Sequence, residues 1–272
     1  MYNNTINGLK AFLDASPSGY HATANLEKML LKEDYEKLSE HDDWTLVPGG
    51  RYFMVRGGTT LIAFWIPHGD PKGFLMSACH TDRPTFKIKE NCELSGVYTR
   101  VTTEKYGGML IAPWLDRPLS VAGRVLVETE DGVESRLINL DRDLMLIPNV
   151  AIHMNRKVND GYAWNPAVDT FPLLGGENAK GKFWGLVEQA AGGHVLGHDL
   201  YLYIREKAKI WAWTANTSPL PAWTIWNASG AAPRASCALP RTAAFPCCAA
   251  STMRRLAPTP PRALRPLCWR IP

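Results

Sequence analysis

The first 80 residues of the chain change from a helical to a strand-like spacing of hydrophobic positions. Apolar residues share one face of a predicted helix over residues 5–13, and the Ser-Pro-Ser-Gly sequence at 16–19 ends it. A second helix follows, marked by Ala22, Leu26, Met29 and Leu30. Residues 52–55, 60–65 and 73–79 are apolar runs bounded by turn sequences, which is typical of strands. Helices followed by apolar strands predict part of an α/β layer.

Residues 90–205 have a different pattern. Short strand-like runs alternate with turn sequences such as Asp131-Gly132 and Asp160-Gly161, and helical periodicity is scarce. We therefore expect a separate, mostly β unit over 90–205, inserted after an α/β segment of residues 1–89. Residues 206–272 would begin a return to the α/β unit and then continue as an aberrant tail from about residue 213.

Composition and charge narrow the classes of function. No apolar run approaches the roughly 18 residues that cross a bilayer, and the N-terminal residues lack the pattern of a secretory signal. We therefore expect a cytoplasmic protein with no membrane partner. The net charge of +4 arises in residues 213–272, which hold 7 of the 30 Lys and Arg but none of the 26 Asp and Glu. The remaining chain is faintly acidic, which does not support nucleic-acid binding.

The composition of residues 213–272 is itself unusual. This segment holds 10 of the 20 prolines and 4 of the 6 cysteines, and it contains no Asp, Glu, Lys or His. A disordered linker is one interpretation, although four tryptophans argue against a solvated segment. A disulfide module is another, but nothing else in the chain indicates an oxidising compartment. The third interpretation is translation in the wrong reading frame.

Candidate chemistry lies at the end of the third apolar run, in the sequence Cys79-His80-Thr81-Asp82-Arg83. A buried strand that ends in His-x-Asp places an imidazole at the carboxyl edge of a sheet, where α/β proteins form their sites. A carboxylate two residues later can orient an imidazole that binds a metal ion. The motif alone more often marks a hydrogen-bonded histidine at a polar strand end.

Three further histidines have simpler interpretations. His194 and His198 show the i, i+4 spacing of zinc ligands. They lack the glutamate of the protease motif and lie among glycines, which favours loop histidines. His153, from its local sequence alone, is expected to be a core or hydrogen-bonded histidine.

Several sequence blocks resemble the aspartyl aminopeptidase family of two-zinc exopeptidases. They follow the order and spacing of that family from residue 6 to about residue 212. The blocks are residues 12–17 with His21, residues 78–84, residues 106–108, residues 114–125, residues 151–156, residues 158–159, residues 172–175 and residues 198–202. The resemblance implies a zinc-exopeptidase-like α/β catalytic domain with an inserted, mostly β lid and assembly domain.

The same resemblance implies a function and a set of site residues. Family members remove an N-terminal residue, which is acidic in some substrates, from peptides with the help of two Zn²⁺ ions. By resemblance His80 would be a zinc ligand and Asp82 the catalytic carboxylate that supports it. His153 would be a substrate-binding residue that reaches toward an active site, often that of a neighbouring subunit. Homo-oligomers are therefore expected.

The family pattern requires more metal ligands than this chain offers. It continues with a bridging Asp in a Leu-Asp-Asp/Asn-Leu motif, a Glu-Glu pair, and a further Asp and His. No Glu-Glu pair follows His80, and residues 213–272 contain no acidic residue or histidine. One histidine and one neighbouring carboxylate cannot hold two zinc ions. We therefore expect an incomplete catalytic domain and little or no activity of this chain.

The wrong-frame interpretation can be tested by back-translating the tail and reading it in the frame that starts at the third base of each codon. Trp is always encoded by TGG, so in this shifted frame Trp213-Thr214 and Trp223-Thr224 both give Asp. Over residues 213–228 this frame admits Glu-Tyr-Ile-Ser-Ala-Pro-Arg-Leu-Asp-Asp-Leu-Glu-Cys, which resembles the bridging-Asp segment of the family. Residues 251–258 admit Asp-Asn-Glu-Glu-Val-Gly-Ser. We infer that the frame was lost near residues 211–213 and that the chain is truncated in consequence.

The frame-loss hypothesis carries expectations for the fold. Residues 213–272 should be irregular, because ten prolines remove hydrogen-bond donors and interrupt helices. The strand that ends at Cys79 should then lie near an exposed sheet edge.

Two other functions stay open at this point. The β unit could act as a non-catalytic assembly module from a truncated subunit. A related two-zinc deacylase or carboxypeptidase is the other, because that broader clan shares His-x-Asp at a strand end. The blocks at residues 114–125 and 151–156 favour the aminopeptidase family.

Overall fold

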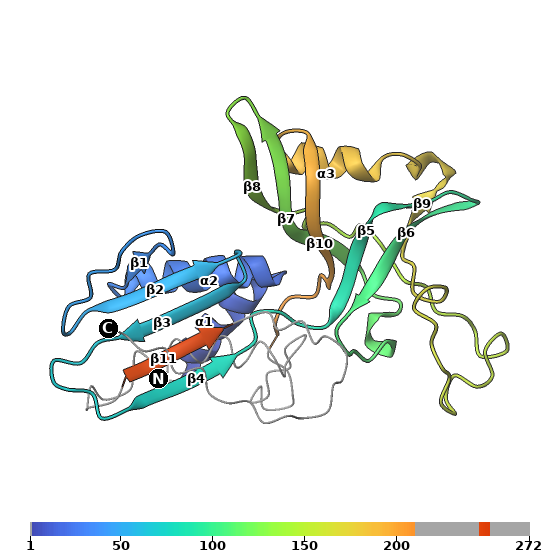
Figure 1. Ribbon diagram of the computed structural model, residues 1–272. Coiled ribbons are helices and arrows are strands. Elements are labelled where there is room, and N and C mark those ends of the chain that lie inside the picture. The colour runs from blue at the N-terminus through green and yellow to red at the C-terminus, as the bar shows by residue number, and fades with distance from the viewer. Residues whose placement is uncertain (1, 210–244, 251–272) are drawn as a thin grey trace, which may run out of the picture.

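The computed structural model describes residues 2–209 and 245–250, which form two β-sheets that each pack against helices (Figure 1). The first sheet has the strand order β1-β2-β3-β11-β4. Its strands are β1 (Glu36–Leu38), β2 (Arg51–Arg56), β3 (Thr60–Trp65), β4 (Phe74–Cys79) and β11 (Phe245–Ala250). Helices α1 (Tyr2–Asp14) and α2 (Gly19–Lys32) pack beside this sheet, and α2 contacts β2 and β3.

Local sequence explains where α2 begins and which face it buries. The side chain of Ser18 caps the helix by accepting a hydrogen bond from the backbone N–H of His21. Leu26 and Leu30 lie one turn apart and are buried together with Phe53 of β2. This small core supports the strand end at which the candidate site lies.

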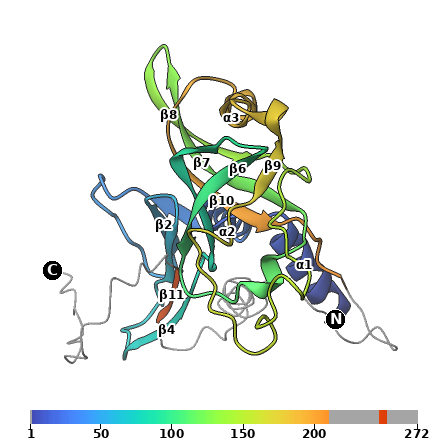
Figure 2. The same ribbon diagram turned by 90° about the vertical axis from the view of Figure 1, so that its right-hand side faces the viewer.

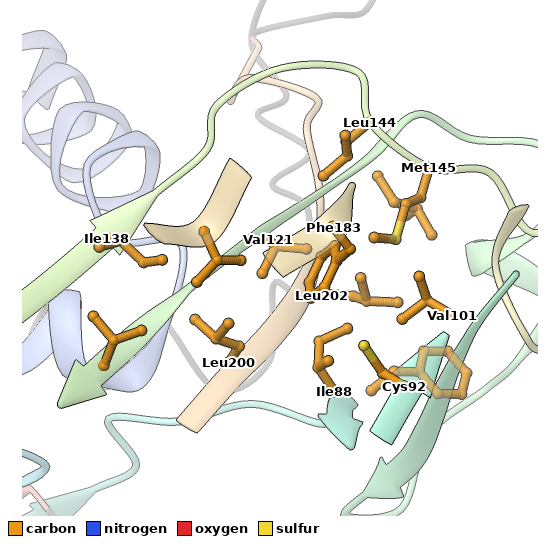
Figure 3. Close-up of a cluster of buried hydrophobic side chains, with 14 of the residues drawn as sticks. Ile88, Cys92, Val101, Val121, Ile138, Leu144, Met145, Phe183, Leu200 and Leu202 are labelled. Carbon is orange, nitrogen blue, oxygen red and sulfur yellow. The ribbon is translucent and has the colours of Figure 1, made fainter. Parts of the chain in front are cut away.

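The second sheet has the strand order β8-β7-β10-β5-β6-β9. Its strands are β5 (Thr85–Leu94), β6 (Tyr98–Tyr106), β7 (Leu119–Thr129), β8 (Gly132–Asn139), β9 (Leu173–Gly176) and β10 (Val195–Ile204). Helix α3 (Phe183–Ala191) and the short helices η1 (Ala112–Trp114) and η2 (Glu177–Ala179) belong to the same region. Figure 3 shows its core, in which Phe183 of α3 lies over Leu200 and Leu202 of β10. All three side chains are fully buried.

The structure confirms the predicted α/β class, both N-terminal helices and the three apolar strands. Residues 90–205 are mostly β as expected, although α3 adds a helix of nine residues. Strand β5 begins before residue 90 and belongs to the second sheet. The domain limits at residues 89 and 205 stay predictions. No helix in the described ranges combines the length and apolar character needed to cross a membrane.

The expectation that residues 213–272 are irregular is wrong for residues 245–250. These residues form β11, which lies between β3 and β4, antiparallel to β3 and parallel to β4. Pro246 is its second residue and is in register with Leu75 of β4, whereas pairing with β3 begins at Cys247. The proline therefore lies at the strand start, where a missing N–H is tolerated. The rest of that expectation concerns residues outside the described ranges.

The strand that ends at Cys79 lies at a sheet edge, as predicted. β4 is the last strand in the order of the first sheet, and in the described part of the chain it pairs only with β11. Phe74, Leu75 and Met76 of β4 are exposed. An edge strand with exposed apolar side chains is prone to aggregation.

Candidate functional site

His80 and Asp82 meet directly after the carboxyl end of β4. His80 Nδ1 lies 3.1 Å from Asp82 Oδ1. Because an ionised carboxylate only accepts hydrogen bonds, Nδ1 is the donor in this contact, and in a neutral imidazole the lone pair of Nε2 is then available to a metal ion. The side chain of His80 is 51% exposed, whereas that of Asp82 is 14% exposed. The pair therefore presents an oriented imidazole to the surface, which suits a metal ligand.

Tyr106 binds the second oxygen of Asp82. Its hydroxyl donates a hydrogen bond of 2.6 Å to Asp82 Oδ2. Tyr106 is the last residue of β6, so this bond joins the second sheet to the loop that follows β4 in the first. The Tyr106 ring packs edge-on against Tyr201 of β10 at 5.5 Å. Asp82 is therefore held from both sides.

A small open cavity lies beside this arrangement. It is lined by the start of α2, by the loop between β4 and β5, and by strands of the second sheet. Asp82 and Tyr106 belong to its wall, and so do Arg83, Tyr20 and Tyr201. The cavity therefore lies at the boundary between the two sheets, next to the predicted site residues.

A cluster of four charged and polar side chains joins helix α2 to the second sheet, and we name it the Asp199 junction. Asp199 of β10 accepts hydrogen bonds from Tyr20 of α2 at 2.8 Å and from Arg124 of β7 at 2.7 Å. Lys87 of β5 lies 2.9 Å from its other oxygen. Burial by itself would raise the pKa of Asp199, but hydrogen bonds from Lys87, Arg124 and Tyr20 outweigh it and lower the pKa to about 2.

The structure does not bring His153 to His80. His153 is exposed, in the irregular segment between β8 and β9, so the expectation of a core or hydrogen-bonded histidine from its local sequence is wrong. Figure 1 shows this segment extending from the second sheet, away from β4. Among the described residues no hydrogen bond or ion pair holds His153, and it does not line the cavity beside Asp82. Its predicted substrate-binding role involves the site of a neighbouring subunit, so the structure of a single chain does not test it.

The other two histidines have structural roles. His194 Nδ1 lies 2.7 Å from Glu188 Oε1, at the end of α3. His198 lies within β10, so the expectation of a loop is wrong for it, because strand pairing with β7 continues through residue 198. The His198 ring packs 4.8 Å from that of Trp184, and burial lowers its pKa. They form no site with His80.

Comparison with known proteins identifies the family. The family model described as "Aminopeptidase I zinc metalloprotease (M18)" matches residues 12–212, which is more than half of the chain. The chain belongs to the M18 family. A "Probable M18 family aminopeptidase 2" of Clostridium novyi is 37% identical over 217 residues, which make up 75% of this chain and 50% of that protein.

Solved structures agree with this assignment. A chain in the cryo-EM structure of the Ape4 and Nbr1 complex is 30% identical, with a TM-score of 0.82 over 90% of this chain and 53% of that one. The S. cerevisiae mApe1 dodecamer shares the fold at 22% identity, with a TM-score of 0.74 over 91% of this chain and 60% of that one. The chain thus spans about half the length of the relatives it matches.

M18 proteins are described as zinc metalloproteases, so the donor atoms of this chain must be compared with the needs of zinc. Zinc sites use at least three protein ligands drawn from Cys, His, Asp and Glu. No group of three such residues that could hold a metal ion occurs within the described ranges. Every His, Asp and Glu of the chain lies between residues 14 and 206, inside those ranges. The described residues therefore do not make a complete zinc centre, and the His80–Asp82 pair could supply one ligand and its supporting carboxylate.

Two hydrogen-bonded contacts at the site could not be predicted from the sequence. Tyr106 belongs to a block that resembles the family, but its bond to Asp82 joins residues 24 positions apart in different sheets. The Asp199 junction joins Tyr20 to a residue 179 positions later. No local spacing signals such contacts, because they depend on how the two sheets pack together.

Proposed function

We propose that residues 1–212 are part of a two-zinc aminopeptidase that removes N-terminal residues, with a preference for acidic ones, from peptides in the cytoplasm. The match of residues 12–212 to the M18 family supports this proposal. The observation that carries it is the His80–Asp82 pair at the strand end, with Tyr106 holding the second carboxylate oxygen. Cys92 is a free thiol, as is usual in a reducing compartment.

We further propose that the 272-residue chain has little or no hydrolytic activity. Only one corner of a zinc centre is present among its histidines and carboxylates. The remaining ligands would come from a segment that the shifted frame encodes after residues 211–213. β11 weighs against the frame-loss hypothesis, which predicts no strand after residue 213. It does not supply the missing carboxylate or imidazole ligands, because residues 245–250 contain no His, Asp or Glu.

Hydrolysis assays on two gene versions test both statements. The first version encodes the 272-residue chain, and the second has one base inserted near codon 212 and continues into the downstream sequence of its gene. We expect the second product to hydrolyse aminoacyl anilides, fastest with acidic residues, and to lose this activity on adding a chelator. The first product should show none. Chelator-sensitive turnover by the 272-residue chain would contradict the proposed inactivity.

The origin of residues 213–272 has a direct check. Sequencing codons 205–230 of the source gene should show one base more than is needed to encode residues 205–230 as given. If independent reads lack that extra base, a sequencing error is excluded as the cause of the frame loss. A stop-free shifted frame extending downstream would then place the loss in the gene itself.

Self-association is part of the proposal. The mApe1 relative is described as a dodecamer, and we propose that this chain also forms homo-oligomers in which His153 reaches toward the site of another subunit. The exposure of His153 and of Ile152 and Met154 beside it supports this role. His153→Ala in the frame-restored protein should raise KM or lower kcat without changing the zinc content.

A further inference from the structure

Strand β8 leaves one edge of the second sheet open. It is the first strand in that sheet's order, and across the part of the chain that the structure describes it pairs only with β7. Figures 1 and 2 show the β7–β8 hairpin projecting away from the first sheet. An open edge presents unpaired N–H and C=O groups that can bind another strand.

The side chains of β8 divide into an apolar and a charged set. Val133 and Leu137 point to one face and are 62% and 42% exposed. Glu134 and Arg136 point to the opposite face, where Arg136 Nη2 lies 2.6 Å from Glu134 Oε2. Arg136 Nη1 also donates a hydrogen bond of 2.8 Å to the carbonyl of Ala191, at the end of α3. Ser135 lies at the centre of this pattern.

This order of residues is self-complementary. Two copies of β8 that pair antiparallel about a two-fold axis must be centred on a single residue, because side chains and hydrogen-bonding groups both alternate along a strand. Centring on Ser135 places Val133 opposite Leu137 of the second copy and Glu134 opposite its Arg136. Centring on Glu134 or on Arg136 instead places like charges directly opposite, which is destabilising.

We propose that β8 is an interaction surface for a second copy of this chain, which adds its own β8 antiparallel in the register centred on Ser135. The contact is isologous, since the same residues serve on both sides. It builds on the proposed self-association by naming one interface, and it requires neither zinc nor hydrolysis. The second sheets of the two copies then form one continuous sheet, with four alternating charges on one face and two apolar pairs on the other.

Charge reversal tests the register. Glu134→Arg places arginines opposite each other, and Arg136→Glu places glutamates opposite each other. Each variant of the full chain should raise the Kd of the dimer by about tenfold or more in sedimentation equilibrium, and an equimolar mixture should restore association. Glu130→Arg at the hairpin turn makes the same charge change outside the pairing and should leave the Kd unchanged. A Kd for Glu134→Arg equal to that of the wild type would overturn the proposal.

A cross-linking variant covers the case in which a charge reversal disturbs folding. In the proposed register Ser135 of one copy lies opposite Ser135 of the other, so Ser135→Cys should form a covalent dimer under mild oxidation. Ser95→Cys, in the turn between β5 and β6, is the matched control, and the wild-type chain reports any dimer formed by its own cysteines. If Ser135→Cys gives no more reducible dimer than these two, the proposed pairing is wrong. Neither result depends on whether the chain hydrolyses peptides.

Discussion

His80 owes its orientation to residues from both sheets. Asp82, two positions later, accepts a hydrogen bond from the imidazole, and Tyr106 of the second sheet holds the other oxygen of the same carboxylate. The sequence predicts the His-x-Asp pair because its members are adjacent along one loop. Tyr106 could not be predicted, because its hydroxyl reaches Asp82 only after the two sheets have packed.

Removing the Tyr106 hydroxyl should therefore weaken the fold as well as the site. Tyr106→Phe keeps the ring contact with Tyr201 but deletes the 2.6 Å hydrogen bond to a largely buried carboxylate. We expect the free energy of unfolding to fall by about 1–2 kcal/mol in urea titrations. Tyr98→Phe, at an exposed ring in the same strand, is the control and should change it little. Equal effects of the two substitutions would remove Tyr106 from its supporting role.

His21 makes stability depend on pH. Burial, followed by the nearby Lys28 charge, lowers the pKa of His21 from 6.5 to about 4. Between these values the unfolded chain binds a proton that the folded chain does not, so stability falls as the pH falls from 6.5 toward 4. One such proton contributes a slope of at most about 1.4 kcal/mol per pH unit.

Substitution isolates that contribution. His21→Gln should flatten the decline in the free energy of unfolding between pH 6.5 and 4, the interval set by the two pKa values. His41→Gln, at an exposed loop position, should leave the decline as it is. The measurement is a series of urea titrations across that interval. An unchanged slope in His21→Gln would show that another group causes the decline.

At the scale of elements, hydrophobic spacing predicts the helices and strands of the first unit well. α1, α2, β2, β3 and β4 all lie where periodicity places them, because each buries apolar residues on a regular face. β11 was not predicted, because residues 245–250 show no alternation and include a proline. Its position between β3 and β4 depends on neighbouring strands rather than on its own pattern.

The edge position of β4 predicts a solubility effect. Met76 is 74% exposed on this edge strand, and a lysine there would discourage pairing with another chain. Met76→Lys should reduce aggregation on warming, measured by light scattering. Met154→Lys is a matched control, since Met154 is 73% exposed but lies outside any strand. If both variants aggregate equally, exposed apolar surface in general and not the β4 edge causes aggregation.

At the scale of the whole molecule, the Asp199 junction holds α2 against the second sheet. Its carboxylate has a lowered pKa of about 2, so the stability it contributes is present above the ordinary value of 3.8 and is lost as the pH falls toward 2. Asp199→Asn should lower the free energy of unfolding by about 2 kcal/mol near pH 7. It should also remove the acid dependence in that interval.

A surface ion pair provides the comparison for this prediction. Asp143 pairs with Arg205 at 2.9 Å, but its side chain is 64% exposed. Exposed pairs contribute little, so Asp143→Asn should cost less than about 1 kcal/mol in the same urea titrations. If Asp143→Asn costs as much as Asp199→Asn, the junction has no special role in holding α2 against the second sheet.

This chain belongs to the M18 family, but its described residues do not provide a complete zinc site. Residues 12–212 match the M18 family, and the relatives are about twice as long as the part they share with it. The sequence predicts the family correctly, because the blocks that resemble it are present in order. That this chain lacks metal ligands stays a prediction, based on the absence of acidic residues after Glu206. The described residues agree, since they offer the His80–Asp82 pair and no third ligand beside it.

The zinc content of the purified 272-residue chain tests this account most directly. The chain would be equilibrated with zinc, passed over a desalting column and analysed by inductively coupled plasma mass spectrometry. Because a single imidazole and its supporting carboxylate do not hold zinc tightly, we expect well under one zinc ion per chain. Two tightly bound zinc ions per chain would show that this chain completes the M18 metal centre and would contradict the account.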